Sequence, residues 1–341
     1  MKTNSILITG GLGFIGSNYI DCLRVQNPSQ NIFVLDKITY AADLKALYRW
    51  KENSNINFIK GDICDGGLLL EIFTKNKIQG VVHFAAESHV DNSINGPQSF
   101  VETNIMGTFQ LLEAARKTWL DENQDMKSEY KKARFHHIST DEVYGALGEK
   151  GFFTEKTAFA PNSPYSASKA SSDHLVRSYY HTYGLPVVTT NCSNNFGPFQ
   201  HSEKLIPTII RKAIQEDPIP IYGTGKNIRD WLFVTDHCKA IQTVFEKGTL
   251  GEVYIVGGDN EKTNLEICTA VIKILDKQKP RLNGKSYFEL ITHVKDRPGH
   301  DFRYAVDASK IKKELGWLAK TSFEDALETT VLHYLRSIKT L

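Results

Sequence analysis

The start of the chain places a glycine-rich turn between a predicted strand and a predicted helix. The apolar run at residues 5–9 predicts the strand, and Gly10, Gly13 and Gly16 lead from it into a helical pattern at residues 16–25. Glycines at this spacing allow a sharp turn, a close approach to a pyrophosphate and tight packing of the helix on the sheet. Because the N-terminus of the helix then faces the phosphates, this unit predicts a dinucleotide-binding α/β fold.

An acidic residue supports this interpretation and indicates which dinucleotide is bound. Asp36 ends the next predicted strand, at roughly the 20-residue distance where an acid bonds the adenosine ribose hydroxyls. A carboxylate there repels a 2′-phosphate, so we expect NAD rather than NADP. The neighbouring Lys37 weakens this preference, because a lysine could bind such a phosphate. Asp62 and Ile63, at the end of the third predicted strand, are expected to flank the adenine.

The rest of the first half repeats the alternation of strand and helix. Further strands are predicted at residues 32–36, 56–60, 80–85 and 135–140, and further helices at residues 99–118 and 165–183. Such alternation is typical of a Rossmann-type, doubly wound parallel sheet with helices on both faces. Residues 121–132 are charged and are expected to form a solvated connection.

After about residue 185 the pattern becomes irregular, with clusters of Asn, Gly and Pro. We expect residues 1–190 to form the NAD-binding domain and residues 191–341 to form mainly a smaller C-terminal substrate-binding lobe. Predicted strands at residues 187–191 and 252–256 return to the main sheet, so about residues 228–258 are assigned back to the first domain. The lobe is therefore expected to be interleaved with that domain.

The composition excludes several classes of protein. Net charge is +2, from 41 Lys and Arg against 39 Asp and Glu, which gives no reason to expect a nucleic acid or a membrane as partner. No apolar run reaches the roughly 18 residues of a membrane span, and no signal peptide is expected before the first strand. The 5 cysteines are scattered without metal-ligand spacing, which favours reduced thiols and a cytoplasmic location.

Tyr165 and Lys169 lie one helical turn apart near the start of a predicted helix, so they share a face. A tyrosine must ionise partly to take a proton from a sugar hydroxyl, and its free pKa is about 10. A nearby ammonium group and the positive charge of a nicotinamide both favour the phenolate. The pair therefore predicts hydride transfer between a hydroxyl-bearing carbon and NAD.

Asp141 and Glu142 follow the predicted strand that ends at Thr140. Successive residues of a strand point to opposite faces, so both carboxylates reach one substrate only if the chain bends after Thr140. The same residues are also typical of a helix N-terminus, with Thr140 or Asp141 as the cap. Because Tyr165 and Lys169 are present as well, we favour a catalytic role.

Acid–base groups beside a redox pair predict an elimination. Oxidation of a hexose at C4 acidifies the C5 hydrogen, which Glu142 can then remove. A protonated Asp141 can deliver a proton to the departing C6 hydroxyl, and the reduced cofactor returns its hydride to C6. Asp141 must then hold a proton near neutral pH, so burial and the Glu142 charge must raise its pKa. Thr140 can bond the C4 oxygen and share its proton with Tyr165.

Longer motifs are similar to one known group of enzymes. They lie at residues 35–41, 83–91, 103–108, 192–198, 203–207, 227–231 and 296–301. Together with the glycine turn and the Tyr–Lys pair, they resemble the extended short-chain dehydrogenase/reductases, and specifically the family of dTDP-glucose 4,6-dehydratases. Related sugar 4-epimerases typically lack the Asp–Glu pair. Phe84 and Phe196 stand where the family usually has leucine and tyrosine, and both keep the position apolar.

The resemblance implies roles for individual residues. It makes Asp141 the proton donor, Glu142 the proton acceptor and Tyr165 the base for C4 oxidation, supported by Lys169. Besides the glycines, the implied NAD contacts are Phe14, Ile15, Asp36, Lys37, Ile38, Thr39, Asp62, Ile63, Phe84, Ala85, Ala86, Glu87, Ser88, Thr103, Tyr165, Lys169 and Asn195. The implied substrate contacts are Ser88, Thr140, Asn194, Lys204, Leu205, Pro220, Ile221, Tyr222, Arg229, Asn264, Asp296, Arg297, Pro298, Gly299 and His300.

Some of these residues suit the chemistry of a nucleotide sugar such as dTDP-glucose. Lys204, Arg229 and Arg297 could bind its diphosphate, and Tyr222 could stack on its base. The resemblance also implies a homodimer, formed by the helices near residues 99–118 and 165–183.

Other functions stay open at this point. The chain could dehydrate a UDP-, CDP- or GDP-linked sugar, act as a 4-epimerase, or regulate another process as a non-catalytic NAD-binding protein. The last has no need of the catalytic residues. No metal site is expected, because His83, His89 and His300 lack the spacing of a ligand set. His83 is instead expected to be a core residue at a strand end.

Overall fold

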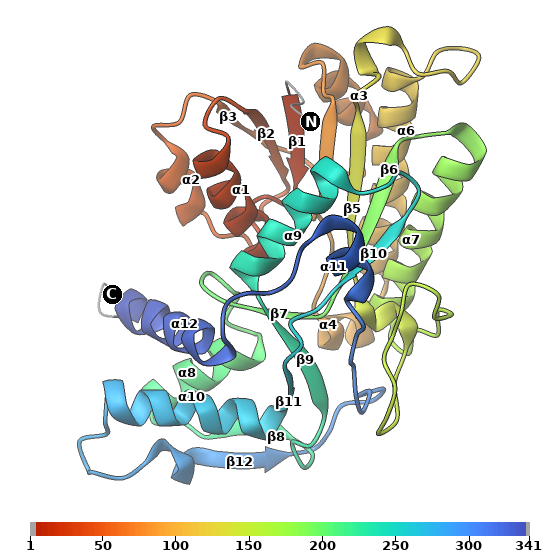
Figure 1. Cartoon of the computed structure of the whole chain (residues 1–341). Coiled ribbons are helices and arrows are strands. Elements are labelled where there is room, and N and C mark those ends of the chain that lie inside the picture. Colours follow the sequence, from red (N-terminus) through yellow and green to blue (C-terminus); the bar gives the residue numbers. More distant parts are fainter. Residues whose placement is uncertain (1–4, 339–341) are drawn as a thin grey trace.

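The computed structural model describes residues 5–338, and a seven-stranded sheet forms its centre. The strands lie in the order β10-β6-β5-β4-β1-β2-β3, and each neighbouring pair is parallel. Their bounds are Ser5–Thr9 (β1), Asn31–Asp36 (β2), Ile56–Lys60 (β3), Gly80–His83 (β4), Arg134–Thr140 (β5), Val187–Cys192 (β6) and Val253–Val256 (β10). The predicted Rossmann-type sheet is confirmed, and so is the return of β6 and β10 to it (Figure 1).

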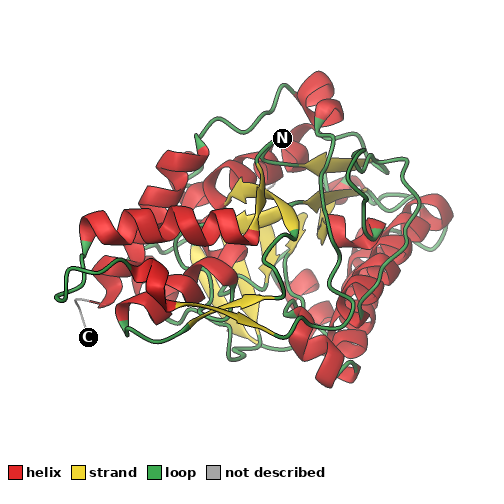
Figure 2. Cartoon of the chain, turned by 90° about the horizontal axis from the view of Figure 1, so that it is seen from below, coloured by secondary structure: helices red, strands yellow, loops and turns green. Residues whose placement is uncertain are grey.

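Helices lie to either side of the strands, as the view from below in Figure 2 shows. In the first half their bounds are Phe14–Gln26 (α1), Lys45–Trp50 (α2), Gly66–Lys75 (α3), Val90–Asn95 (α4), Gln98–Phe100 (α5), Thr108–Trp119 (α6) and Pro164–Tyr183 (α7). Later in the chain, α9 (Val234–Lys247) packs beside α1. None of the described helices is long and apolar enough to cross a membrane.

Alternate residues of the central strands enter two different cores. Leu7 of β1 belongs to the core that α3, α6 and α7 cover, whereas Ile6 and Ile8 belong to the core that α1 and α9 cover. Every residue of β1 is buried, as expected for a parallel strand covered on both faces. His83, at the end of β4, is 1% exposed and bonds Thr9 and Thr108, so its prediction as a core residue is confirmed.

The glycine turn needs glycine for steric reasons. Gly10 has a φ of +66°, and a Cβ atom there would lie 2.6 Å from the backbone nitrogen of Ala85. At Gly16 a Cβ atom would collide with the carbonyl oxygen of Gly10. The turn therefore packs directly against the segment after β4, and this sets the N-terminus of α1 at the carboxyl edge of the sheet.

Two segments differ from the predicted elements. The helix predicted at residues 99–118 runs from α5 through a π-helical segment, η1 (Val101–Gly107), into α6. Within η1 the Asn104 amide bonds the backbone of Glu87 at 2.8 and 3.0 Å and the Ser168 hydroxyl at 2.8 Å. Apolar periodicity does not report such a local widening of the helix. The connection at residues 121–132 contains a short 3-10 turn, and its Tyr130 is buried rather than solvated.

The C-terminal part adds two small sheets and a separate core. The strands are Asn194–Phe196 (β7), Ile219–Tyr222 (β8), Ile228–Phe233 (β9), Glu261–Thr263 (β11) and Ile291–Val294 (β12). The helices are Leu205–Ile214 (α8), Asn264–Gln278 (α10), Ser309–Leu315 (α11) and Phe323–Ile338 (α12). Only Ser193 separates β6 from β7, so this part joins the main sheet at the carboxyl end of β6. Most of it lies below the main sheet in Figure 1, whereas α11 packs beside β10 of that sheet.

Candidate active site

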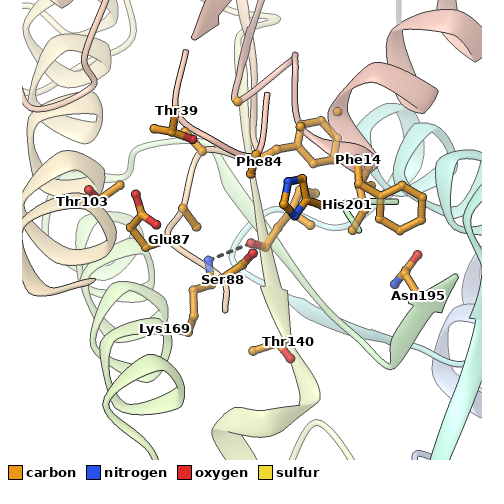
Figure 3. Close-up of a pocket in the computed structure, with 18 of the residues that line it drawn as sticks. Phe14, Thr39, Phe84, Glu87, Ser88, Thr103, Thr140, Lys169, Asn195 and His201 are labelled. Carbon is orange, nitrogen blue, oxygen red and sulfur yellow. Dashed lines mark hydrogen bonds between the residues drawn. The ribbon is translucent and has the colours of Figure 1, made fainter. Parts of the chain in front are cut away.

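A cavity of about 320 Å³ lies at the carboxyl ends of strands β1 to β6 of the main sheet. Ligands of doubly wound sheets bind at this edge. The last residues of two strands line it directly, since Asp36 ends β2 and Thr140 ends β5. In Figure 3, Thr140 and Lys169 lie in the lower part of the cavity, and Phe14 and Asn195 lie to the right.

One end of the cavity has the shape and donors that a dinucleotide requires. The three glycines of the turn line it, and the tight backbone packing that they allow lets the chain approach a pyrophosphate closely. Asp36 accepts hydrogen bonds from the backbone N–H groups of Leu12 and Ile38, both at 2.9 Å. Burial raises the pKa of Asp36, and these two hydrogen bonds oppose the rise. The residues present therefore fit a bound dinucleotide.

The charge of Lys37 is compensated inside the protein. Its ammonium forms an ion pair with Asp62 at 3.0 Å. This pairing removes the main argument for a 2′-phosphate at this position, because the carboxylate already holds the cation.

Both predicted carboxylates point into the cavity from the bend after β5. The strand ends at Thr140, and a 3-10 turn, η3 (Asp141–Tyr144), follows at once. Thr140 Oγ1 donates to Asp141 Oδ1 and accepts from the Glu142 backbone N–H, each at 3.3 Å. The capping and the catalytic interpretations are thus compatible, since one hydroxyl caps the turn while both carboxylates line the cavity.

Burial sets the proton affinity of these carboxyl groups. Asp141 is 1% exposed, and its burial, aided by the Glu142 charge, raises its pKa well above the usual range. Burial also raises the pKa of Glu142, but Arg297, Arg229 and Lys204 counteract the rise. The pKa of both neighbours is thus raised, but that of Asp141 further, because three cations limit the rise at Glu142.

Tyr165 and Lys169 come from the first turns of α7. Ser163 caps this helix through a reciprocal capping box with Ser166, and Pro164 is its first residue. The Lys169 ammonium donates to the Ile138 carbonyl at 2.9 Å, and burial lowers its pKa. Burial also raises the pKa of Tyr165, although the Thr140 hydroxyl opposes this. The protein's own groups thus favour the neutral phenol, and the expected lowering of its pKa, which includes the charge of a bound nicotinamide, stays a prediction.

The three predicted diphosphate cations are held at fixed positions around Glu142. Lys204 donates to the Ser88 carbonyl at 3.0 Å. Arg229 donates to the Asp301 carbonyl at 3.0 Å and lies over the ring of Tyr304. Arg297 forms an ion pair at 3.1 Å with Asp91, a residue that the sequence motifs include but that was not predicted as a site residue.

The cavity gathers the predicted catalytic residues and nearly all the predicted cofactor contacts. Those that line it are Gly10, Gly13, Phe14, Ile15, Gly16, Asp36, Lys37, Thr39, Asp62, Ile63, Phe84, Ala85, Ala86, Glu87, Ser88, Thr103, Thr140, Asp141, Glu142, Tyr165, Lys169, Asn194, Asn195 and Lys204. Ile38 is the exception: its φ is +61°, its N–H orients Asp36, and its side chain packs against the core around α1.

The remaining predicted substrate residues lie outside this cavity, in the C-terminal part. They are Leu205, Pro220, Ile221, Tyr222, Arg229, Asn264, Asp296, Arg297, Pro298, Gly299 and His300. Several are connected with one another. The hydroxyl of Tyr222 bonds Asp91 at 3.2 Å, and His300 bonds Asp296 at 2.6 Å.

Sequence reasoning missed a group of lining residues between β7 and α8. Gln200, His201 and Glu203 reach the cavity from this connection, and His201 lies near its centre in Figure 3. Their position just before Lys204 was the available signal. The connection is fixed at Phe199, which has a φ of +68° and lies 4.0 Å beneath the Arg49 guanidinium. Other lining residues that were not predicted are Leu35, Ala41, Ala42, Gly61, Ile138, Ser139, Cys192 and Ser193.

Comparisons with known proteins cover almost the whole chain. A family model described as GDP-mannose 4,6 dehydratase matches residues 7–330. A dTDP-glucose 4,6-dehydratase of Xanthomonas campestris is 52% identical over 329 residues, which are 96% of this chain and 92% of the relative. One from Salmonella typhimurium is 50% identical over 339 residues, which are 97% and 92% of the two chains. The chain belongs to the dTDP-glucose 4,6-dehydratase family.

Solved structures agree with this membership. The dTDP-glucose 4,6-dehydratase of Streptomyces venezuelae, solved with NAD bound, has a TM-score of 0.89 and 40% identity over 98% of both chains. That of Bacillus anthracis, also in complex with NAD, has a TM-score of 0.86 and 43% identity over 99% of this chain and 98% of that one. A UDP-glucose 4-epimerase of Thermotoga maritima shares the fold at a TM-score of 0.84, over 98% and 99% of the chains, with 27% identity. The resemblance inferred from the motifs is confirmed.

Removal of the Asp141 carboxylate should stabilise the folded protein. Because burial raises its pKa, ionisation of this group costs folding free energy above the unfolded-state pKa of about 4. Asp141→Asn should therefore raise the melting temperature by roughly 2 °C or more. The gain should be larger at about pH 8 than at about pH 5, as measured by thermal unfolding followed by circular dichroism.

Asp236→Asn is the matched control, because Asp236 is also 1% exposed but lies outside the cavity. Burial alone would raise its pKa, yet hydrogen bonds from Thr321 and the charge of Lys239 lower it. Its ionised form therefore stabilises the fold at neutral pH, and the variant should melt at a lower temperature. A lower melting temperature for Asp141→Asn at about pH 8 would contradict the assigned electrostatics.

Proposed function

We propose that this protein converts dTDP-glucose to dTDP-4-keto-6-deoxy-glucose and water with bound NAD, as a step in deoxysugar biosynthesis. The observation that carries the proposal is that Asp141 and Glu142 line the same cavity as Tyr165 and Lys169. A plain dehydrogenase or a non-catalytic NAD-binding regulator has no use for two neighbouring carboxylates at this place. Relatives at about 50% identity over nearly the whole chain bear the name of this activity.

The first step is the oxidation of the sugar at C4. Tyr165 removes the proton of the C4 hydroxyl, and the Thr140 hydroxyl bonds the same oxygen. When bound, NAD supplies the hydride acceptor for C4, the hydride donor for C6 and a positive charge beside the phenol. Because burial raises the pKa of Tyr165, this charge and that of Lys169 must together favour the phenolate. A general base so placed contributes roughly 10²–10⁴-fold to the rate.

The second step is the loss of water across C5 and C6. The 4-keto group acidifies the C5 hydrogen, and Glu142 accepts it as a proton; the nearby cations Arg297, Arg229 and Lys204 favour its ionised form. Asp141 donates a proton to the C6 hydroxyl, which leaves as water. C6 then takes up the hydride removed from C4, and C5 is reprotonated. Asp141 Oδ1 bonds Thr140, whereas Oδ2 has no hydrogen-bond partner among the described residues. Oδ2 is thus the oxygen that carries the transferable proton.

The nucleotide part of the substrate is proposed to extend toward the C-terminal lobe, residues 191–341. Lys204, Arg229 and Arg297 would bind the diphosphate, and Tyr222, which is 41% exposed, would stack on the base. The dTDP identity rests on the names of the relatives. NAD would occupy the domain formed by residues 1–190 and the returning segment 228–258, where Asp36 meets its ribose.

We also propose a homodimer in the cytoplasm. Val101 and Met106 of η1 are 49% and 47% exposed although both are apolar, and η1 packs beside α7. Burying these side chains between two copies would stabilise a dimer. Light scattering at micromolar concentration should give twice the 38.5 kDa mass of one chain, and a monomer would sink this part of the proposal. All five cysteines are free, which suits the cytoplasm; cell fractionation tests that location.

The proposed reaction is tested by incubating the protein with dTDP-glucose, UDP-glucose, CDP-glucose and GDP-mannose separately. Mass spectrometry should show the loss of one water from dTDP-glucose at the highest rate. An isomer of unchanged mass would instead indicate a 4-epimerase, and no product from any of the four would overturn the proposal.

Two variants test the roles of the two carboxylates in this reaction. Asp141→Asn and Glu142→Gln remove one proton-transfer group each and keep the size of the side chain. Both should retain bound NAD and slow the water loss by roughly 10²–10⁴-fold. Dehydration at the unmodified rate would refute the roles assigned to these carboxylates.

A further inference from the structure

A buried carboxylate that takes no part in the proposed chemistry lies directly behind the active site. Asp173 is one helical turn beyond Lys169 and two beyond Tyr165, so the three residues share one face of α7. It is 6% exposed. Its Oδ1 is 3.1 Å from His137 Nε2, and its Oδ2 accepts from the Asn191 amide at 2.9 Å.

The Asn191 amide connects this carboxylate with the bend that carries the catalytic acid and base. Asn191 lies in β6, beside Ser139 of β5, and is fully buried. Its Nδ2 group donates to Asp173 and also to the backbone carbonyl of Thr140, at 3.1 Å. Thr140 is the last residue of β5 before η3. A single side-chain amide thus fixes the end of the strand relative to α7.

Asp173 is also the acidic residue one helical turn from Lys169 on the same face of α7. Burial lowers the pKa of Lys169, and the largest opposing contribution comes from Asp173. Burial also lowers the pKa of His83 and His137, which keeps both neutral. The Cys192 thiol also faces Lys169, but burial raises its pKa to about 12. Burial raises the pKa of Asp173 to about 6, and the Lys169 charge opposes the rise. Asp173 is therefore mainly ionised at neutral pH, and among the described groups that act on this ammonium it supplies the compensating charge.

We propose that Asp173 is a positioning residue with two effects. It keeps Lys169 charged and, through Asn191, it holds the Thr140 carbonyl. Tyr165 and Lys169 thereby keep their position relative to Asp141 and Glu142. Asp173 acts through other groups and touches neither sugar nor cofactor. Asp173 lies outside the cavity lining, and both of its carboxylate oxygens have partners within the protein. The inference rests on the proposed function, since it assigns Asp173 to that same reaction.

The test compares Asp173→Asn with the unmodified protein, once the latter has been shown to dehydrate dTDP-glucose. Loss of the carboxylate charge should let Lys169 release its proton at a lower pH. The alkaline limb of the kcat–pH profile should then move down by about one pH unit or more, and kcat at neutral pH should fall about tenfold or more. KM should change by less than about twofold, because Asp173 does not contact the substrate.

Four further variants separate this role from a structural one. Asp236→Asn, the buried carboxylate outside the cavity, should leave the alkaline limb in place. Asp173→Glu should keep the alkaline limb at its original pH, whereas Asp173→Gln, which is as large as glutamate but uncharged, should not. This pair of variants also tests the role if Asp173→Asn does not fold. Asn191→Leu should lower kcat, because it removes the bond that holds the Thr140 carbonyl.

The outcomes are distinguishable from a failure of the proposed function itself. If the unmodified protein dehydrates no nucleotide sugar, the proposed function fails. If it is active but Asp173→Asn keeps its alkaline limb, or if Asp173→Glu and Asp173→Gln behave alike, the positioning role is overturned.

Discussion

The point on which the site depends is the end of β5 at Thr140, in the middle of the parallel sheet. The strand is buried on both faces, and its last residue pairs with Cys192 of β6. The chain then leaves the sheet in a 3-10 turn, and Thr140 Oγ1 caps that turn while bonding Asp141. Two adjacent carboxylates can reach one cavity only because of this bend, since a continued strand would send them to opposite faces.

Burial of Asp141 and Lys169 places the stability of the fold and the needs of the reaction in opposition. Asp141 and Lys169 are both removed from water. Burial raises the pKa of Asp141 and lowers that of Lys169, so it favours the neutral form of each. A protonated carboxyl is what the elimination needs from Asp141. A neutral amine is not what the oxidation needs from Lys169, so the fold supplies Asp173 behind it. Buried charges of this kind destabilise a fold unless they are compensated, and are expected where function requires them.

The sequence predicted the sheet, the glycine turn and the residue pairs that now line one cavity, because each depends on local patterns. Buried strands, a strand–turn–helix with glycines and two residues one helical turn apart are all visible in one dimension. The π-helical segment at Val101–Gly107 was not predictable, since its hydrogen bonds depend on Glu87 and Ser168. His201 and the Asp173–Asn191 bridge were also missed, because these contacts join segments far apart in the chain. The burial of Tyr165, which raises its pKa, was not visible in the sequence either.

The central claim is that one cavity oxidises C4, eliminates water and reduces C6 in a single passage. Incubating the protein with dTDP-glucose that carries deuterium at C4 tests this most directly. The account predicts that the deuterium appears at C6 of the product, with a solvent-derived hydrogen at C5. Deuterium retained at C4, as an epimerase would give, or lost to water, would contradict it.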